Sequence, residues 1–299
     1  RAREMGMHEF YVSSLSSQDV VYKGMFLAQD IDTFYPDLQD HRFISRVAIF
    51  HQRYSTNTFP EWRLAQPFRM LAHNGEINTL KGNINWMKSH EIRMTSEIFG
   101  EDGEYTKPVI QPGSSDSAAL DQVFELLVRA GRPATVAKTL LIPEAWSKQV
   151  SALPPEWRAM YEYCNSVMEP WDGPAAIAAY DGRWAIAGLD RNGLRPLRYA
   201  ITEDGILAVG SETGMCPLGE RKVCERGSIA PGRTIAVDLE KGEFYSSEDL
   251  LDRLAEPGDD EHRVDLGQEG QGVGDDQRGR AVDDGEVVVI GSRAEHLAD

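Results

Sequence analysis

The chain has 299 residues, a formal net charge of −17 and a hydrophobic content of 41%. This length allows one large domain or two smaller ones, with enough apolar residues for a core. The negative charge argues against nucleic acids and anionic membrane surfaces as partners, and no apolar run approaches the ~20 residues of a membrane-spanning helix. The three cysteines, Cys164, Cys216 and Cys224, show no CxxC spacing, so we expect no zinc site, no disulfide framework and a cytoplasmic protein.

The first half of the chain predicts a few strands followed by helices. Short apolar-aromatic runs separated by serines predict strands within residues 1–28, and Val47-Ala48-Ile49-Phe50 predicts a buried strand that ends just before Arg53. Apolar residues at helical spacing then predict helices. These helices are expected over residues 80–100, 117–130 and 134–150, and from Pro154 to about 168, with Cys164 on the buried face of the last one.

The second half predicts mainly strands. Asp181-Gly182 joins two apolar runs, 175–180 and 183–189, as a hairpin turn, and Asp204-Gly205 joins 198–202 to 206–210 in the same way. A further strand is expected within 228–237. Because the helices and the strands fall in separate runs, we expect an α+β fold.

The composition changes near residue 251. From there to residue 299 the chain is strongly acidic and glycine-rich, and no aromatic residue follows Tyr245. Such a composition is unlikely to form a core. We therefore expect a domain over 1–250 and an acidic, Gly-rich tail over 251–299 that is disordered or encoded out of frame.

Polar residues with matching chemistry gather between His51 and Asp116. Arg53 follows the predicted strand, where its planar guanidinium could bind a carboxylate through two hydrogen bonds. The alternative for a lone Arg is a structural salt bridge. His51 and His73 are expected to be structural, because no third residue completes a metal-binding spacing.

Asn74-Gly75 and Asp116 supply the other two parts of this candidate site. The Asn74 side-chain amide and the Gly75 N–H could stabilise a developing oxyanion, although the same dipeptide is also an ordinary turn. Asp116 could bind an ammonium group, although on local sequence Asp116 or a neighbouring Ser is first a helix N-cap. The three parts together suit a free amino acid whose side-chain carbonyl is attacked.

As a set, these segments resemble a known family. Arg53-Tyr54-Ser55-Thr56, His73-Asn74-Gly75-Glu76 and Ser115-Asp116-Ser117 are similar to the glutaminase site of class II glutamine amidotransferases. The string from His51 to Trp86 resembles the large subunits of glutamate synthases. The likeness runs from the start of the chain to about Phe244 and includes Trp171-Asp172-Gly173-Pro174 and Leu189-Asp190-Arg191-Asn192-Gly193.

The resemblance implies roles for individual residues. Arg53 would hold the α-carboxylate of L-glutamine with Thr56 beside it, Asn74 and Gly75 would form the oxyanion hole, and Asp116 would accept the α-ammonium. The family's nucleophile is an N-terminal Cys whose own α-amino group serves as base. Residue 1 is Arg here, and the first cysteine is Cys164, which we expect to be a core thiol. The resemblance therefore implies a substrate cradle without its nucleophile.

The resemblance also implies the architecture and the partners. The expected fold is the four-layer αββα sandwich of N-terminal-nucleophile hydrolases, incomplete at its N-terminus. The chain would be the glutaminase part of a glutamate synthase, truncated at both ends. FMN and an iron–sulfur cluster would belong only to the full-length protein, and the partners would be its remaining synthase domains and a small reductase subunit. A glutamine-binding module without hydrolysis, or a gene remnant, is the alternative.

Overall fold

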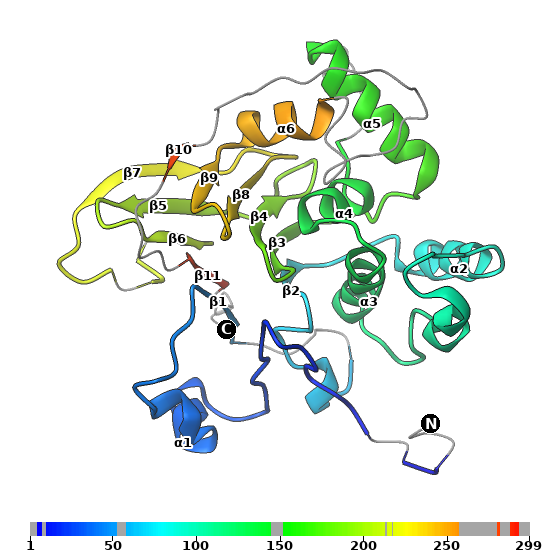
Figure 1. The fold of residues 1–299 in the computed structure, drawn as a ribbon, viewed down its shortest axis with the longest axis horizontal. Helices are drawn as coiled ribbons and strands as arrows, with labels where there is room; N and C mark the ends of the chain where they lie inside the picture. The colour runs from blue at the N-terminus through cyan, green and yellow to red at the C-terminus, as the bar shows by residue number, and fades with distance from the viewer. Residues whose placement is uncertain are drawn as a thin grey trace, which may run out of the picture.

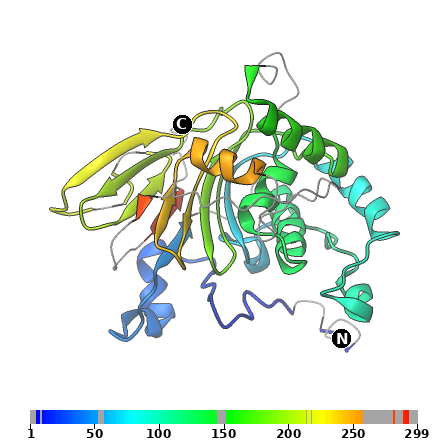
Figure 2. The same ribbon diagram turned by 45° about the horizontal axis from the view of Figure 1, so that its top comes forward.

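The structure is a computed structural model. It describes residues 5–7, 10–52, 58–144, 152–212, 214–216, 218–256, 280–281 and 288–292. Two β-sheets lie face to face, and helices cover the outer face of one of them (Figures 1 and 2). None of the helices within these ranges is long and apolar enough to cross a bilayer.

One sheet is antiparallel and has the order β10-β9-β8-β4-β3-β2. Its strands are β2 (Leu71–Gly75), β3 (Ala175–Tyr180), β4 (Trp184–Leu189), β8 (Thr234–Asp238), β9 (Glu243–Tyr245) and β10 (Arg280–Ala281). Asp181 lies in the turn of the central β3–β4 hairpin, and its carboxylate stabilises this turn by accepting hydrogen bonds from the N–H groups of Arg183 and Trp184.

The second sheet is mixed and has the order β1-β11-β6-β5-β7. Its strands are β1 (Val47–His51), β5 (Arg198–Thr202), β6 (Leu207–Gly210), β7 (Val223–Ser228) and β11 (Val288–Ser292). Strand β11 runs parallel to both β1 and β6 and joins them, whereas β5 is antiparallel to β6 and β7.

The helices lie mainly beside the six-stranded sheet. They are α1 (Ile31–Phe34), α2 (Leu80–Glu91), α3 (Asp116–Arg129), α4 (Ala134–Leu141), α5 (Pro155–Val167) and α6 (Ser247–Ala255), with 3-10 turns at Ala28–Asp30, Pro36–Gln39, Trp62–Leu64 and Gly100–Thr106. Helix α3 contacts β2, α4 contacts β4, and α6 contacts β8.

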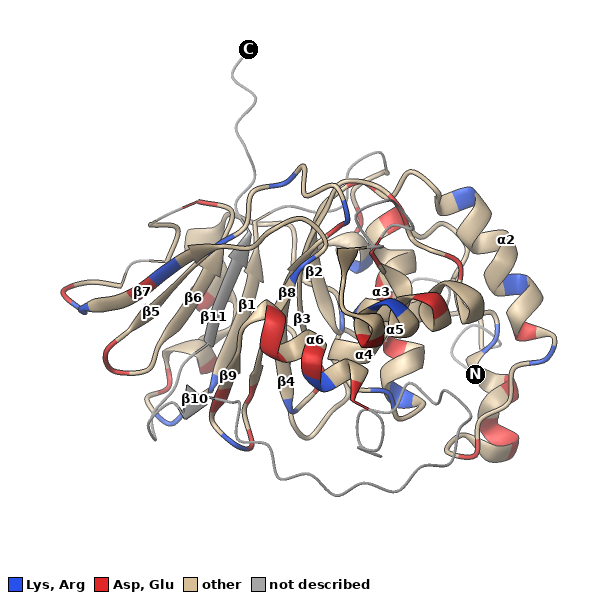
Figure 3. Cartoon of the chain, turned by 90° about the horizontal axis from the view of Figure 1, so that it is seen from above, with Lys and Arg blue, Asp and Glu red and all other residues tan. Residues whose placement is uncertain are grey.

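Two apolar cores follow from the alternation of side chains along β3 and β4. Trp184 and Ile186 pack with the helices, whereas Ala185 and Leu189 of the same strand pack between the two sheets. Because both faces are buried, these strands are continuous apolar runs without a charged residue. In Figure 3 the charges lie on the helices, the loops and other strands such as β7.

The α+β class is confirmed, and within the described residues the chain forms three layers, helix–sheet–sheet. The outer helical layer of the expected αββα sandwich is not seen in this part of the chain. Both predicted hairpins are present as β3–β4 and β5–β6. The strand expected within 228–237 is confirmed as β8, which begins at Thr234. Strand β7 of the other sheet ends at Ser228, and the chain turns between the two strands at Pro231 and Gly232, where Gly232 has φ +71°.

Three further expectations differ from the structure. Residues 10–27 form no strand, because Ser14 and Ser16 side chains accept nearby backbone N–H groups and replace ladder bonding. Helix α2 ends at Glu91 instead of near Gly100, and beyond it Ile92 and Ile98 are exposed whereas Met94 packs against the core. Helix α4 ends at Leu141, and residues 145–151 lie outside the described ranges.

The boundary expected between residues 250 and 251 falls inside helix α6. This helix begins with a capping box between Ser246 and Asp249, and Leu250, Leu251 and Leu254 are buried against the core. Two short segments further on, β10 and β11, pair with the two sheets.

Candidate functional site

The outer edge of β2 organises the candidate site. Strand β2 is the last strand of its sheet in the described residues, and alternate residues direct their backbone groups outward. His73 N donates to Gln66 Oε1 at 2.7 Å, and its carbonyl accepts from Gln66 Nε2 at 2.9 Å. Leu71 N donates to Asp121 Oδ1 at 3.0 Å. The Gln66 and Asp121 side chains therefore take the place of a further strand.

Gly75 is the next residue whose backbone faces this edge. It lies opposite Ala175 of β3. Both backbone groups of Ala175 bond to Asp190 on the other side: Ala175 N donates to Asp190 Oδ1, and Asp190 N donates to the Ala175 carbonyl, each at 2.9 Å. In an antiparallel pair, the backbone groups of two facing residues either point at each other or both point away from each other. Since the Ala175 groups point away, toward Asp190, the Gly75 N–H also points away from β3. It is thus placed to donate to an oxygen beyond the strand edge.

Only glycine fits at position 75. Its φ is +152°, and a Cβ built there would lie 1.7 Å from the Pro174 carbonyl oxygen. The same oxygen accepts a hydrogen bond from Glu76 N at 2.8 Å. The turn after β2 is therefore wedged against the start of β3, and the direction of the Gly75 N–H depends on that contact.

Asp116 lies at this turn. It is the first residue of α3, and Ser115 is the N-cap, because Ser115 Oγ accepts from Ala118 N at 3.1 Å. Asp116 is therefore free of the capping role, and its Oδ2 accepts from Ile77 N at 2.9 Å. The structure thus joins the start of α3 to the turn that follows Asn74 and Gly75.

His73 joins β2 to the first turn of α3. Its Nδ1 lies 2.7 Å from Ser117 Oγ, and the ring is buried. Burial lowers the pKa of His73, although the Asp116 carboxylate acts in the opposite direction. His73 is thus a neutral, packed residue of the β2–α3 contact, as expected for a structural histidine.

Arg53 and Thr56 lie outside the described residues. Strand β1 ends at His51, shortly before them, and β1 contacts β2. The role of Arg53 and Thr56 therefore stays a prediction.

The cysteines do not supply a reactive thiol at this turn. Cys164 is fully buried on α5, and burial raises its pKa to about 12, so its thiol is not ionised near neutral pH. This confirms the expectation of a core thiol. Burial also raises the pKa of the half-buried Cys216, and the exposed Cys224 lies on β7 with its Sγ 3.4 Å from the Ile201 carbonyl.

No catalytic role was expected for the segment 190–193, which in the family it resembles lies near the site and helps to shape it. The structure ties Asp190 of this segment to the strand opposite Gly75. Next to it, Arg191 Nη2 donates to Asp172 Oδ2 at 2.6 Å, and the Asp172 carbonyl accepts from Asn78 N at 2.8 Å. The segments 172–175 and 190–193 therefore hold the turn 74–79 from one side. An Asp directly after a fully apolar strand and before Asn-Gly is the sequence signal that could have shown this.

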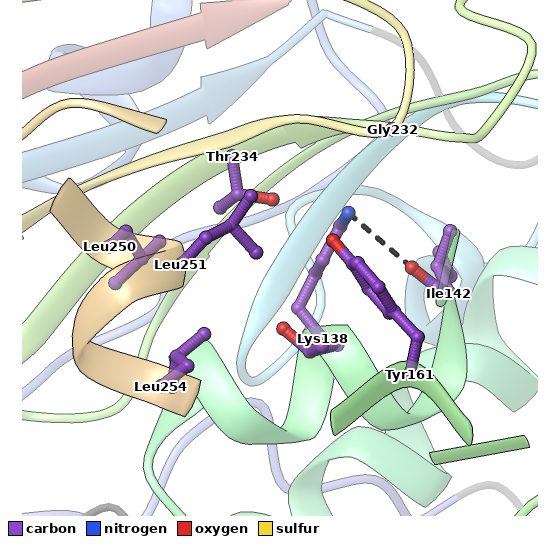
Figure 4. A pocket seen from close by; sticks show the side chains of 9 residues that line it. Lys138, Ile142, Tyr161, Gly232, Thr234, Leu250, Leu251 and Leu254 are labelled. Carbon is purple, nitrogen blue, oxygen red and sulfur yellow. Dashed lines mark hydrogen bonds between the residues drawn. The ribbon is translucent and has the colours of Figure 1, made fainter. Parts of the chain in front are cut away.

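A small cavity lies apart from this turn, between α4, α5, α6 and the sheet (Figure 4). It measures about 10 Å³, room for about one water molecule. Its lining includes Lys138, Tyr161 and Leu254, and the Lys138 ammonium points toward the Ile142 carbonyl. The cavity is too small for an amino-acid ligand.

Several relatives resemble this chain over most of its length. It is 58% identical over 249 residues to the glutamate synthase [NADPH] large chain of Azospirillum brasilense, covering 83% of this chain and 16% of that one. It is 47% identical over 247 residues to the corresponding large chain of Bacillus subtilis, with coverages of 83% and 16%. It is 46% identical over 256 residues to the chloroplastic ferredoxin-dependent glutamate synthase 2 of Arabidopsis thaliana, with coverages of 85% and 16%.

The chain thus spans about one sixth of the length of these relatives. Among solved structures, glutamine phosphoribosylpyrophosphate amidotransferase from Bacillus subtilis matches with 19% identity and a TM-score of 0.33, covering 64% of this chain and 32% of that one. The family model of class-II glutamine amidotransferases matches residues 1–261. The chain belongs to the class-II glutamine amidotransferase family.

Proposed function

We propose that this chain binds L-glutamine at the turn after β2 and is the glutaminase portion of a glutamate synthase. The observation that carries the proposal is the Asp116–Ile77 hydrogen bond, because it holds a carboxylate beside an outward-facing Gly75 N–H. A carboxylate and an N–H donor at one place match the α-ammonium and the amide oxygen of glutamine. Three relatives over 45% identical are glutamate synthases, which supports the assignment.

Each residue would have one task in this proposal. Arg53, with Thr56 beside it, would bind the α-carboxylate of glutamine in a bidentate manner. Asp116 would pair with the α-ammonium, and the amide oxygen would face the Asn74 side-chain amide and the Gly75 N–H. As charge develops on that oxygen during attack, these preorganised donors stabilise it without reorganisation.

The attacking group would be a thiolate, as the family resemblance implies. Attack on the glutamine side-chain carbonyl forms a thioester and releases ammonia, and water then hydrolyses the thioester to glutamate. Cys164 is excluded from this role by its burial and raised pKa. We propose that the chain binds glutamine and that Cys164 is not the thiolate that attacks it.

The synthase chemistry would lie in other parts of the enzyme. Ammonia would be used there to convert 2-oxoglutarate to glutamate, with FMN, an iron–sulfur cluster and a small reductase subunit. The described residues of this chain do not fit such a cluster. Cys164, Cys216 and Cys224 lie on separate segments, and the described residues contain no group of three side chains that could hold a metal ion. We propose a cytoplasmic location, which the three free cysteines support.

Calorimetric titration with L-glutamine tests the binding, and a glutaminase assay tests the catalysis. We expect saturable heat from the wild-type chain, and any ammonia release should be unchanged in Cys164→Ser, because the Cys164 thiol is buried and not ionised near neutral pH. Loss of that activity in a folded Cys164→Ser protein would overturn the exclusion of Cys164. A folded chain that gives no saturable heat would overturn glutamine binding.

A further inference from the structure

Asp190 extends the sheet beyond the end of β4. It directly follows Leu189, the last residue of that strand, and only 1% of its surface is exposed. Its N–H donates to the Ala175 carbonyl, and its Oδ1 accepts from Ala175 N, both at 2.9 Å. The carboxylate thus occupies the place of a backbone carbonyl in the ladder and fixes the first residue of β3 from both of its backbone groups.

The remaining oxygens of Asp190 bind the loop that it begins. Asp190 Oδ2 accepts from Asn192 N at 2.9 Å, and its carbonyl oxygen accepts from Gly193 N at 3.0 Å and from Gly232 N at 2.8 Å. Every polar group of Asp190 is therefore engaged by backbone. A residue bound in this way acts on a ligand only through the segments that it holds.

A buried lysine contacts the last residue of β4. Lys138 of α4 is 3% exposed, and its Nζ donates to the Leu189 carbonyl at 3.1 Å. Asp190 and Glu144 are the acidic groups that act on it, and Arg233 opposes them. The Lys138 ammonium therefore lies at the end of β4, beside the residue that precedes Asp190.

Ala175, which Asp190 binds, lies directly opposite the candidate oxyanion donor Gly75. Ala175 is the cross-strand partner of Gly75, and the preceding Pro174 carbonyl fills the space where a Gly75 side chain would lie. A shift of Ala175 or Pro174 therefore changes the direction of the Gly75 N–H. The strength of such a donor depends steeply on its aim.

We propose that Asp190 is a positioning residue that aims the Gly75 N–H at the substrate oxygen by fixing Ala175. This inference rests on the glutamine site proposed above. Asp190 touches no substrate atom in this scheme. Its loss should weaken the hold on the reacting amide oxygen more than the hold on the amino-acid end of the substrate.

Two ligands separate those effects. L-methionine sulfone has the amino-acid end of glutamine and a tetrahedral side-chain centre with oxygens, so it mimics the intermediate, whereas L-glutamine is planar at its amide. In the whole chain, Asp190→Asn should weaken the sulfone about tenfold and glutamine about twofold or less, because only the misdirected oxyanion donor is affected. The amide NMR signal of Gly75 should shift in the same variant.

Asp181→Asn is the matched control. Asp181 also binds backbone N–H groups of the β3–β4 hairpin, from Arg183 and Trp184, but at the other end of the strands, and it also binds Ala134 N at 2.7 Å. This variant should lower the melting temperature while leaving the ratio of the two affinities and the Gly75 signal unchanged.

The possible results separate this inference from the proposed function. Equal losses for both ligands in Asp190→Asn, or an unchanged affinity for the sulfone, would overturn the positioning role while glutamine binding stands. A changed ratio in Asp181→Asn as large as that in Asp190→Asn would also overturn it. A folded wild-type chain that binds neither ligand would overturn the proposed function and this inference with it.

Discussion

Asp116 Oδ2 accepts a hydrogen bond of 2.9 Å from the N–H of Ile77, which is 39 residues earlier in the chain. This bond joins the first turn of α3 to the turn after β2. It places a carboxylate next to the segment whose Gly75 N–H points off the sheet edge. The candidate ammonium acceptor and the candidate oxyanion donor are therefore neighbours.

Asp116→Asn separates the charge of this residue from its structural hydrogen bond. The Asn side chain keeps an oxygen that can accept from Ile77 N, so the melting temperature should stay close to that of the wild type. Glutamine affinity should fall about tenfold or more, because a hydrogen bond to a charged group contributes about 1.5–3 kcal/mol. Calorimetry measures the affinity. Unchanged binding in this variant would remove Asp116 from the site.

Gly75→Ala should damage both the fold and the site. A Cβ at position 75 would meet the Pro174 oxygen at 1.7 Å, at a φ of +152°, so we expect a loss of about 1–3 kcal/mol or more in the free energy of unfolding. The control is Gly82→Ala in α2, where no atom lies within 4 Å of the new Cβ. That change should stabilise the protein by about 0.5–1 kcal/mol. Equal effects of the two substitutions in denaturant titrations would contradict the wedged turn.

Lys138 should make the stability depend on pH. Burial lowers its pKa from 10.5 to about 8. Between these values the unfolded chain holds a proton that the folded chain does not, so the free energy of unfolding should rise with pH. From pH 8 to 9.5 this rise should be about 2 kcal/mol for one lysine.

Lys138→Met should remove that part of the rise. Lys23, which is also buried and whose pKa burial also lowers to about 8, should contribute a similar part that Lys23→Met removes instead. Urea titrations at several pH values measure both slopes. A Lys138→Met protein with the full wild-type slope would show that Lys138 is protonated in the folded state.

Two truncations test where the core ends. Ending the chain after Leu250 removes the buried Leu251 and Leu254 and the Asp252 carboxylate, which accepts from Trp157 Nε1 at 2.9 Å. Ending it after Glu256 keeps them. Because each buried leucine contributes about 2–3 kcal/mol, the shorter protein should be less stable by several kcal/mol. Equal unfolding free energies would mean that α6 is not part of the core.

The sequence was sufficient for the elements that carry their own local signals. The Asp-Gly turns predicted both hairpins, and Pro154 with the spacing of Trp157, Met160 and Cys164 predicted α5 and its buried face. The strands predicted within residues 10–27 are wrong, because among the described residues no strand pairs with this segment and serine side chains bind its backbone instead.

The candidate site was only partly predictable. The resemblance named Asn74, Gly75 and Asp116, but the Asp116–Ile77 bond joins residues far apart in sequence and needs the packing of α3 on β2. The resemblance placed the segment 190–193 near the site, but the particular contact of Asp190 could not be predicted, because it depends on Ala175 and Gly75 being cross-strand partners. Pairings between distant strands are set by tertiary structure, which local patterns do not contain.

The central claim is that a guanidinium, a carboxylate and the Asn74-Gly75 donors bind one glutamine molecule. Calorimetric titration of L-glutamine into the wild-type chain and into Arg53→Lys tests it most directly. We predict saturable binding for the wild type and an affinity about tenfold lower for Arg53→Lys, because an ammonium cannot reproduce the bidentate contact with the α-carboxylate. Equal affinities of the two folded proteins, or no saturable heat from either, would contradict this account.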